Sequence, residues 1–177
     1  TAGIHNLFVR LDHSGIWEGF IPDLNRGEVY KYHIDGFNGK ILDKGDPYAH
    51  YWELKPKTAS ITWNFEYNWK DEQWMEGREK YNSLDAPYSV YEVHLASWMK
   101  PDPYQQESYF SYWQLAERLV PYVKEMGFTH VELMPVMEFD GNESWGYNTS
   151  FHMALDKFYG TSDKFKELID VCHQNGI

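Results

Sequence analysis

The spacing of hydrophobic residues changes along the chain. Up to about residue 69, short apolar runs alternate with polar positions and are separated by turn residues such as Pro22-Asp23 and Asp35-Gly36. Alternation with close spacing is typical of an antiparallel β-sandwich. The pattern predicts strands at residues 7–11, 15–21, 28–34, 40–42 and 60–63.

From Ser89 onward the pattern is that of strands alternating with helices. Residues 89–95 and 130–136 are short runs rich in β-branched and aromatic residues, which predicts two strands with apolar cores. A helical pattern separates these two strands, and a second helical pattern follows the later one. Strands that alternate with helices are expected to pair in parallel through right-handed crossovers.

The first of these helices carries clear start and stop signals. Ser111 and Gln114 have the Ser-x-x-Gln spacing of a capping box, and apolar residues follow at helical spacing. Gly127 suits the left-handed position after the last turn. Because Pro121 lies inside the helix, we expect a kink there.

The second helix is predicted to begin near Thr161 or Ser162, either of which could cap it, and to end at Gly176. Asp163 lies in its first turn, where a negative charge is favourable.

Two β-α units cannot cover both faces of a parallel sheet. We therefore expect the chain to be part of a longer protein.

Residues 68–87 are polar and aperiodic, which predicts a connection between two domains. We place the boundary near residue 80. The predicted first domain then spans residues 1–80, and an incomplete α/β domain spans residues 81–177.

Composition narrows the possible partners. The formal net charge of -11 leaves no basic stripe for phosphate groups, so neither nucleic acid nor an anionic membrane surface is expected as a partner. The single cysteine, Cys172, excludes a disulfide framework and is compatible with a reducing compartment such as the cytoplasm. A neutral substrate fits this charge best.

Aromatic residues make up 18% of the chain, and many stand among polar, glycine and proline residues. Sugar rings stack their C–H faces on aromatic rings in the way that bases stack on aromatic platforms. Four tryptophans of the first part are candidate sugar platforms: Trp17, Trp52, Trp63 and Trp69.

The loops that follow the two predicted parallel strands are the places to look for chemistry, because the carboxyl ends of such strands carry the sites of β/α barrels. The second loop, residues 137–150, is long and contains Glu138, Asp140 and Glu143. Two carboxylates are the minimal machinery for glycoside hydrolysis. Composition alone does not assign a catalytic role to any of these three acids.

Other catalytic signatures are absent from the sequence. The histidines lack the spacing of a metal site, and no glycine-rich phosphate loop or nucleophile elbow is present. We therefore expect neither a metal nor an organic cofactor.

Several blocks of sequence resemble the 1,4-α-glucan (glycogen) branching enzymes of the α-amylase superfamily, and together they cover almost the whole chain. The blocks are Gly45-Asp-Pro-Tyr-Ala49, residues 56–60, residues 82–98, residues 112–135 and Ser144-Trp-Gly-Tyr147. The resemblance implies a β-sandwich carbohydrate-binding module followed by the first two β/α units of a truncated (β/α)8 TIM barrel.

The resemblance also implies roles for particular residues. Tyr147 matches a tyrosine that lies against the sugar beside the scissile bond, and its neighbours Asp140, Trp145 and Asn148 are weaker candidates for substrate binding. Branching enzymes usually carry glutamine where this chain has Asn148. The family's nucleophile and acid/base lie beyond Ile177, so no catalytic residue is assigned and the isolated chain is expected to be inactive.

The implied substrate is an α-1,4-glucan such as glycogen or amylose, and the implied reaction is a retaining double displacement that forms α-1,6 branches. Two alternatives stay open. One is an α-amylase-type hydrolase, since only the acceptor distinguishes it from a transferase. The other is a non-catalytic glucan-binding protein.

Overall fold

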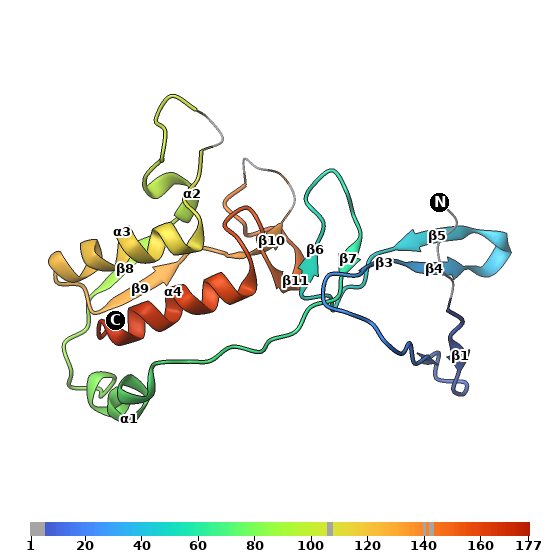
Figure 1. Cartoon of the computed structure of the whole chain (residues 1–177), viewed down its shortest axis with the longest axis horizontal. Helices are drawn as coiled ribbons and strands as arrows, with labels where there is room; N and C mark the ends of the chain where they lie inside the picture. Colours follow the sequence, from blue (N-terminus) through green and yellow to red (C-terminus); the bar gives the residue numbers. More distant parts are fainter. Residues whose placement is uncertain (1–5, 106–107, 140, 142–143) are drawn as a thin grey trace.

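The computed structural model describes residues 6–105, 108–139, 141 and 144–177 (Figure 1). The elements of the first part are β1 (Val9–Arg10), β2 (Trp17–Glu18), β3 (Val29–Tyr30), β4 (Tyr32–Asp35), η1 (Phe37–Gly39), β5 (Ile41–Lys44), β6 (Tyr51–Trp52) and β7 (Ser60–Ile61). Those of the second are α1 (Glu72–Tyr81), β8 (Val90–Val93), α2 (Leu95–Trp98), α3 (Tyr112–Glu125), β9 (His130–Leu133), β10 (Met137–Phe139), β11 (Thr149–Leu155) and α4 (Ser162–Gln174).

The strands of the first part pair in antiparallel fashion, as predicted, but they are short. They form the pairs β1–β2 and β4–β5 and a sheet with the order β3-β7-β6. The predicted strand at residues 28–34 is divided at Lys31 between two sheets, and β6 was not predicted. A two-residue strand such as β6 is too short to show an alternating pattern.

A partly buried carboxylate, that of Asp46, links these sheets. The hydroxyls of Tyr30 and Tyr32 donate to Oδ2 of Asp46 at 2.7 and 3.1 Å. The backbone N–H of Asp46 donates to Oγ of Ser60, which is fully buried. Burial, reinforced by Asp46, raises the pKa of both tyrosines, so the phenols stay protonated donors.

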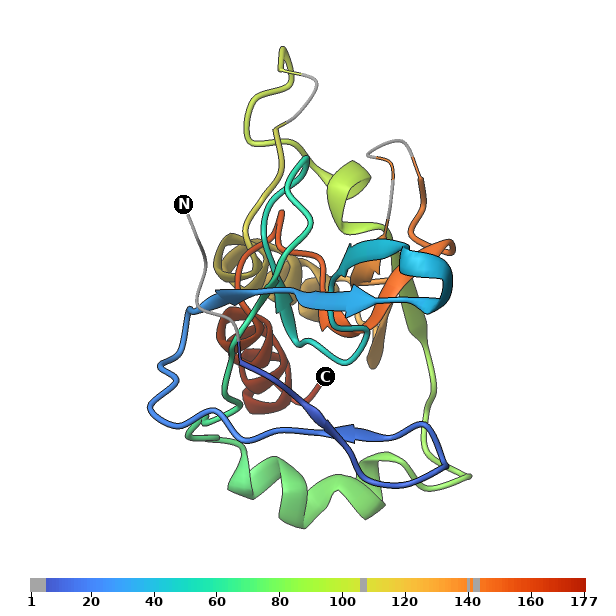
Figure 2. The same cartoon turned by 90° about the vertical axis from the view of Figure 1, so that its right-hand side faces the viewer.

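The two strands of the second part pair in parallel, as predicted. Val90 of β8 lies opposite His130 of β9, and the register continues to Val93 and Leu133. Helix α3 connects the two strands and packs beside α4 on them (Figures 1 and 2).

Helix α3 begins and ends where the sequence predicts. Oγ of Ser111 accepts the N–H of Gln114 at 3.3 Å, and Oε1 of Gln114 accepts the N–H of Ser111 at 2.9 Å, which completes the capping box. Gly127 has φ 79°, and the N–H of Phe128 bonds the carbonyl of Val123 at 3.1 Å, as in a Schellman motif. The helix runs without interruption through Pro121, where a kink was predicted.

Helix α4 ends in the same way, at Gly176 with φ 77°. It begins at Ser162 with Thr161 in the N-cap position, as predicted, but the Thr161 side chain makes no capping hydrogen bond. Instead, Oγ of Ser162 accepts the indole N–H of Trp63 at 2.8 Å, and Asp163 forms an ion pair with Arg26. The first part of the chain thus occupies the N-terminus of α4.

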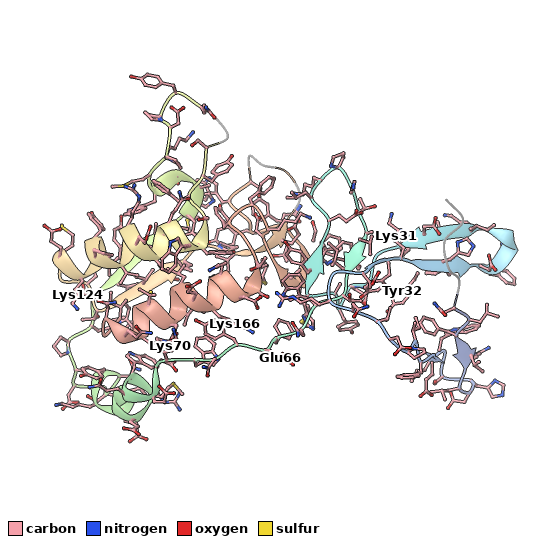
Figure 3. All side chains as sticks on the ribbon, in the orientation of Figure 1. Lys31, Tyr32, Glu66, Lys70, Lys124 and Lys166 are labelled. Carbon is pink, nitrogen blue, oxygen red and sulfur yellow. The ribbon has the colours of Figure 1, made fainter. Side chains whose placement is uncertain are left out.

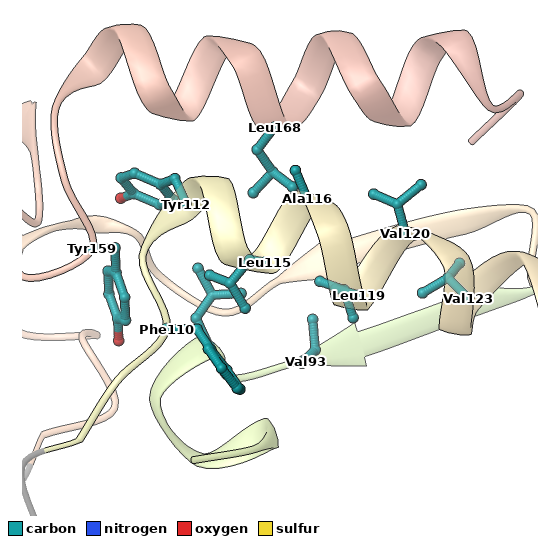
Figure 4. Close-up of a cluster of buried hydrophobic side chains, with 11 residues drawn as sticks. Val93, Phe110, Tyr112, Leu115, Ala116, Leu119, Val120, Val123, Tyr159 and Leu168 are labelled. Carbon is teal, nitrogen blue, oxygen red and sulfur yellow. The ribbon is translucent and has the colours of Figure 1, made fainter. Parts of the chain in front are cut away.

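The main core lies between α3, α4 and the parallel strands (Figure 4). Leu115, Leu119 and Val123 of α3 are at most 1% exposed. Tyr112 is also fully buried, and its backbone N–H donates to the carbonyl of Tyr159 at 2.8 Å. The apolar face of α3 therefore supplies most of the core.

The predicted connection at residues 68–87 contains a helix, α1, which was not predicted. Helix α1 has no fully buried residue, which explains why its sequence shows no apolar face. An extended segment that contains Glu66 and Lys70 leads to α1 along α4, the helix that carries Lys166 (Figure 3). Lys166 donates to the carbonyl of Phe65, and the N–H of Lys70 donates to Asp170.

The segment at residues 137–150 was predicted as one long loop, and this was also wrong at its ends. Met137–Phe139 and Thr149–Leu155 pair as an antiparallel hairpin, with register shifts on both sides of Glu138. No helix among the described residues is long and apolar enough to cross a membrane.

Candidate functional site

The candidate site lies at the carboxyl ends of β8 and β9. The backbone N–H of Met134, just after β9, donates to the carbonyl of Val93 at the end of β8. The N–H of Asp156, just after β11, donates to the carbonyl of Val136 at 2.8 Å. The first bond extends the pairing of β8 and β9, and the second closes the base of the β10–β11 hairpin, which follows β9 at the edge where β/α proteins place their sites.

Gly146 fixes the part of the connection between β10 and β11 that we call the site loop, residues 144–148. Its φ of 89° is left-handed, and a Cβ there would lie 3.0 Å from the carbonyl oxygen of Pro135. The glycine is buried, whereas Trp145 and Tyr147 on either side of it are 68% and 69% exposed. Close backbone packing at Gly146 therefore turns two aromatic side chains toward solvent.

Polar side chains hydrogen-bond to the backbone of Gly146, between these two aromatic residues. Oγ of Ser144 accepts the N–H of Gly146 at 3.1 Å, and the hydroxyl of Thr149 donates to the carbonyl of Gly146 at 3.5 Å. Asn148 is exposed beside Tyr147 and offers an amide to a ligand. The predicted site residue Asp140 lies outside the described residues, as does Glu143.

Glu138, the remaining acid considered in this segment, is buried rather than available to substrate. Its side chain is 3% exposed and lies 3.7 Å from Nζ of Lys157, which is 4% exposed. Burial raises the pKa of the Glu138 carboxyl, and Lys157 opposes this effect. Burial lowers the pKa of Lys157, with Glu138 opposing. The pair is a structural feature beneath the site loop.

A second buried carboxylate lies near this pair. Asp156 is 3% exposed, and burial raises its pKa while its Oδ1 accepts the N–H of Phe158 at 3.0 Å. Asp156, His94 and Ser144 line a hollow of about 20 Å³, close to the size of one water molecule. Burial lowers the pKa of His94, which favours its neutral form.

The four candidate sugar platforms differ widely in exposure. Trp52 is 4% exposed and stacks on Phe151, so its prediction as a platform was wrong. Trp63 stacks on Tyr51, and the guanidinium of Arg26 lies over it. Only Trp17 and Trp69, at 62% and 38% exposure, present substantial surface among these four described residues.

Sequence reasoning did not single out Asp156 or Lys157. A signal was present, since both follow directly on the apolar end of β11, where charged residues need partners. Among the described residues, no group of three or more histidine, cysteine or acidic side chains is placed to hold a metal ion.

Two separate parts of the chain match models of known protein families. Residues 3–49 match the model of carbohydrate-binding module 48, the isoamylase N-terminal domain, and residues 114–177 match the model of the α-amylase catalytic domain. The chain therefore combines a carbohydrate-binding module with part of an α-amylase catalytic domain, and this combination defines its class of protein.

Relatives narrow the class. The chain is 46% identical over its full length to a 1,4-alpha-glucan branching enzyme of Albidiferax ferrireducens, of which it covers 28%. It is also 46% identical, over 95% of its length, to the branching enzyme of Aromatoleum aromaticum, of which it covers 26%. The chain thus spans about a quarter of these curated relatives. The predicted resemblance to branching enzymes of the α-amylase superfamily is confirmed.

A solved structure shares the fold. A putative α-amylase from Salmonella typhimurium superposes with a TM-score of 0.67 at 25% identity, over 89% of this chain and 24% of that one. The fold of most of this chain is therefore shared with a protein described as a putative α-amylase.

Proposed function

We propose that the chain is part of a 1,4-α-glucan branching enzyme that cleaves α-1,4-glucosidic bonds and transfers the glucan to a 6-hydroxyl, forming α-1,6 branches by a retaining double displacement. One observation carries the proposal. Trp145 and Tyr147 project into solvent from the carboxyl ends of the parallel strands, in a chain whose full length matches branching enzymes. The substrate would be glycogen or amylose.

In this proposal Tyr147 stacks on a glucose ring, Trp145 extends the apolar surface, and Asn148 binds sugar hydroxyls. Asp140 would be a further contact. The chain supplies no catalytic carboxylate of its own. The burial of Glu138 and Asp156 supports this assignment, because neither side chain can reach a sugar ring.

We also propose that β8 and β9 are the first two strands of a (β/α)8 barrel. Support comes from an apolar hollow of about 620 Å³ beside β9, lined in part by Leu133, Ile169 and Cys172. A further parallel strand with α4 as its crossover would cover this surface. Residues 1–80 would form the carbohydrate-binding β-sandwich with its linker, and residues 81–177 the start of the barrel.

The test uses the intact protein and the chain side by side. Amylose incubated with the intact protein should acquire α-1,6 linkages, detected by proton NMR, whereas residues 1–177 alone should leave amylose unchanged. Formation of reducing ends without α-1,6 linkages would favour the α-amylase-type hydrolase, to which Asn148 and the superposed putative α-amylase point.

The site loop can be tested on the chain itself. Titration with maltoheptaose, followed by calorimetry, should show binding that Tyr147→Ala weakens. Tyr104→Ala is the matched control, because Tyr104 is 96% exposed and lies outside the site loop. Equal effects of both substitutions would contradict the role of Tyr147. Binding by the chain together with no reaction in the intact protein would favour a glucan-binding protein.

We place the protein in the cytoplasm, where glycogen-type glucans would be made. Its single cysteine supports this location, since Cys172 has no cysteine with which to pair within the chain. The net charge of -11 supports the further proposal that neither nucleic acid nor membrane is a partner.

A further inference from the structure

Residues 1–80, which we propose as the carbohydrate-binding module with its linker and call the module below, contact the β10–β11 hairpin on both sides of the site loop. On one side, Nζ of Lys55 donates to the carbonyl of Phe139, the last residue of β10. On the other side, Trp52 stacks on Phe151 of β11, with 3.4 Å between ring centroids and an interplanar angle of 21°. Both contacts come from β6 and the turn that follows it, residues 51–59, as the adjacent position of β6, β10 and β11 in Figure 1 indicates.

The two contacts converge on one rung of the hairpin. Phe151 is the cross-strand partner of Glu138, and Phe139 is the next residue along β10. A third contact lies nearby, since Nδ1–H of His50 donates to the carbonyl of Met153 at 3.1 Å. The module therefore contacts both strands of the hairpin, one before and one after the connection that contains the site loop.

Electrostatic attraction also favours the contact between the module and the hairpin. The hairpin and the residues after it bury two carboxylates, Glu138 and Asp156, but only one ammonium group, that of Lys157. The ammonium of Lys55 is close enough to lower the pKa of both carboxyls against the effect of burial. The module thus supplies the second cation that two buried anions require.

We propose that Trp52 and Lys55 are positioning residues for the sugar-binding site loop: the module holds the hairpin in the geometry that presents Trp145 and Tyr147 to glucan. The inference rests on the proposed role of the site loop. It assigns the module a task at the carboxyl end of the parallel strands in addition to any sugar binding on its own surface.

The test compares Lys55→Met with Lys57→Met in the chain of residues 1–177. Both changes remove one ammonium from the same turn, but Lys57 pairs with Glu53 at the surface, where its side chain is 73% exposed. Lys55→Met should weaken maltoheptaose binding about fivefold, the factor for ordering one loose aromatic side chain on binding. Lys57→Met should leave the affinity unchanged.

A pair at the other contact separates positioning from general packing. Trp52→Leu should weaken binding to a similar extent, whereas Trp52→Phe, which retains a ring to stack on Phe151, should restore most of the affinity. Hydrogen exchange measured without sugar gives an independent readout. Amides of residues 144–151 should exchange faster in Lys55→Met than in Lys57→Met, while urea midpoints report any global loss of stability.

The outcomes are distinguishable. If Tyr147→Ala leaves binding unchanged, the proposed sugar contact fails, whatever the exchange data show, and the positioning role fails with it. If Tyr147→Ala weakens binding but Lys55→Met and Trp52→Leu do not, the sugar contact stands and the positioning role is overturned. Unchanged exchange at residues 144–151 in Lys55→Met would also overturn it.

Discussion

The indole ring of Trp74 lies parallel to the imidazole ring of His173, with 3.7 Å between their centroids and an interplanar angle of 2°. Nδ1–H of His173 also donates to Oδ2 of Asp71 at 2.6 Å. Together the stack and the hydrogen bond attach α1 to the last turn of α4. They are side-chain contacts of α1 that compensate for its lack of a buried apolar face.

His173→Ala should therefore release α1 while the main core stays folded. Stacking and a charge-assisted hydrogen bond are together worth about 2 kcal/mol, so local opening should become more than about tenfold more frequent. Trypsin cleavage after the exposed residues Arg78 and Lys80 measures this opening. His152→Ala removes an exposed histidine of β11 and is the control. Equal cleavage of the two variants would show that α1 is held by other contacts.

Leu115→Ala should lower the free energy of unfolding by about 3 kcal/mol, because the Leu115 side chain is 0% exposed and packs in the main core. Urea unfolding monitored by circular dichroism measures the loss. Glu117→Ala, on the exposed face of the same helix, should change stability by less than about 0.5 kcal/mol. A loss below about 1 kcal/mol for Leu115→Ala would contradict the core described for α3.

Glu138→Gln should destabilise the protein by about 3 kcal/mol, since it leaves the ammonium of Lys157 buried without its carboxylate. The double variant Glu138→Gln/Lys157→Met should recover most of this loss, because neither charge then remains. As a control, Glu167→Gln breaks the pair with Lys164 near the surface and should cost less than about 1 kcal/mol. A double variant no more stable than Glu138→Gln would argue against a direct interaction.

Asp156 gives a prediction about pH. Burial raises the folded-state pKa of its carboxyl above the ordinary value of 3.8, so the native state holds this proton more tightly than the unfolded state. The wild type should therefore lose stability relative to Asp156→Asn as the pH rises from 4 through the folded pKa, and the difference should then level off.

Asp12 is the control for the direction in which stability changes with pH. Its pKa is lowered from 3.8 by hydrogen bonds from Ser14, so the wild type should gain stability relative to Asp12→Asn as the pH rises from the folded pKa through 3.8, and the difference should level off above that. Urea unfolding of the wild type, Asp156→Asn and Asp12→Asn at several pH values provides the data. A constant difference between wild type and Asp156→Asn would contradict the burial of that carboxylate.

Local signals were sufficient to predict much of the second part of the chain. Ser111 and Gln114 lie three residues apart, and Gly127 follows its helix directly, so capping depends on neighbours in sequence. The parallel pairing of β8 and β9 followed from the alternation of strands and helices. In the site loop, the sequence resemblance identified Trp145 and Tyr147, and the structure adds that both are exposed.

Features that depend on distant residues were not predicted. Helix α1 is held through Trp74 by His173, and Trp52 is buried because Phe151 covers it. Pairing between β10 and β11 brings together residues of a segment whose glycine, asparagine and acidic composition favours a loop. In each case the deciding contact joins positions whose relation cannot be seen in a local window.

The extended chain along α4 has a consequence for the order of folding. Tyr67 and Lys70 bond to Asp170, which lies 103 and 100 positions later in the sequence. At a synthesis rate of about 5 to 20 residues per second, Asp170 is synthesised roughly 5 to 20 seconds after Tyr67 and Lys70. Trp69 and Trp74 lack their partner His173 during the same interval, so a nascent chain exposes aromatic surface that the folded chain partly covers. We expect this interval to be when the protein is most exposed to aggregation.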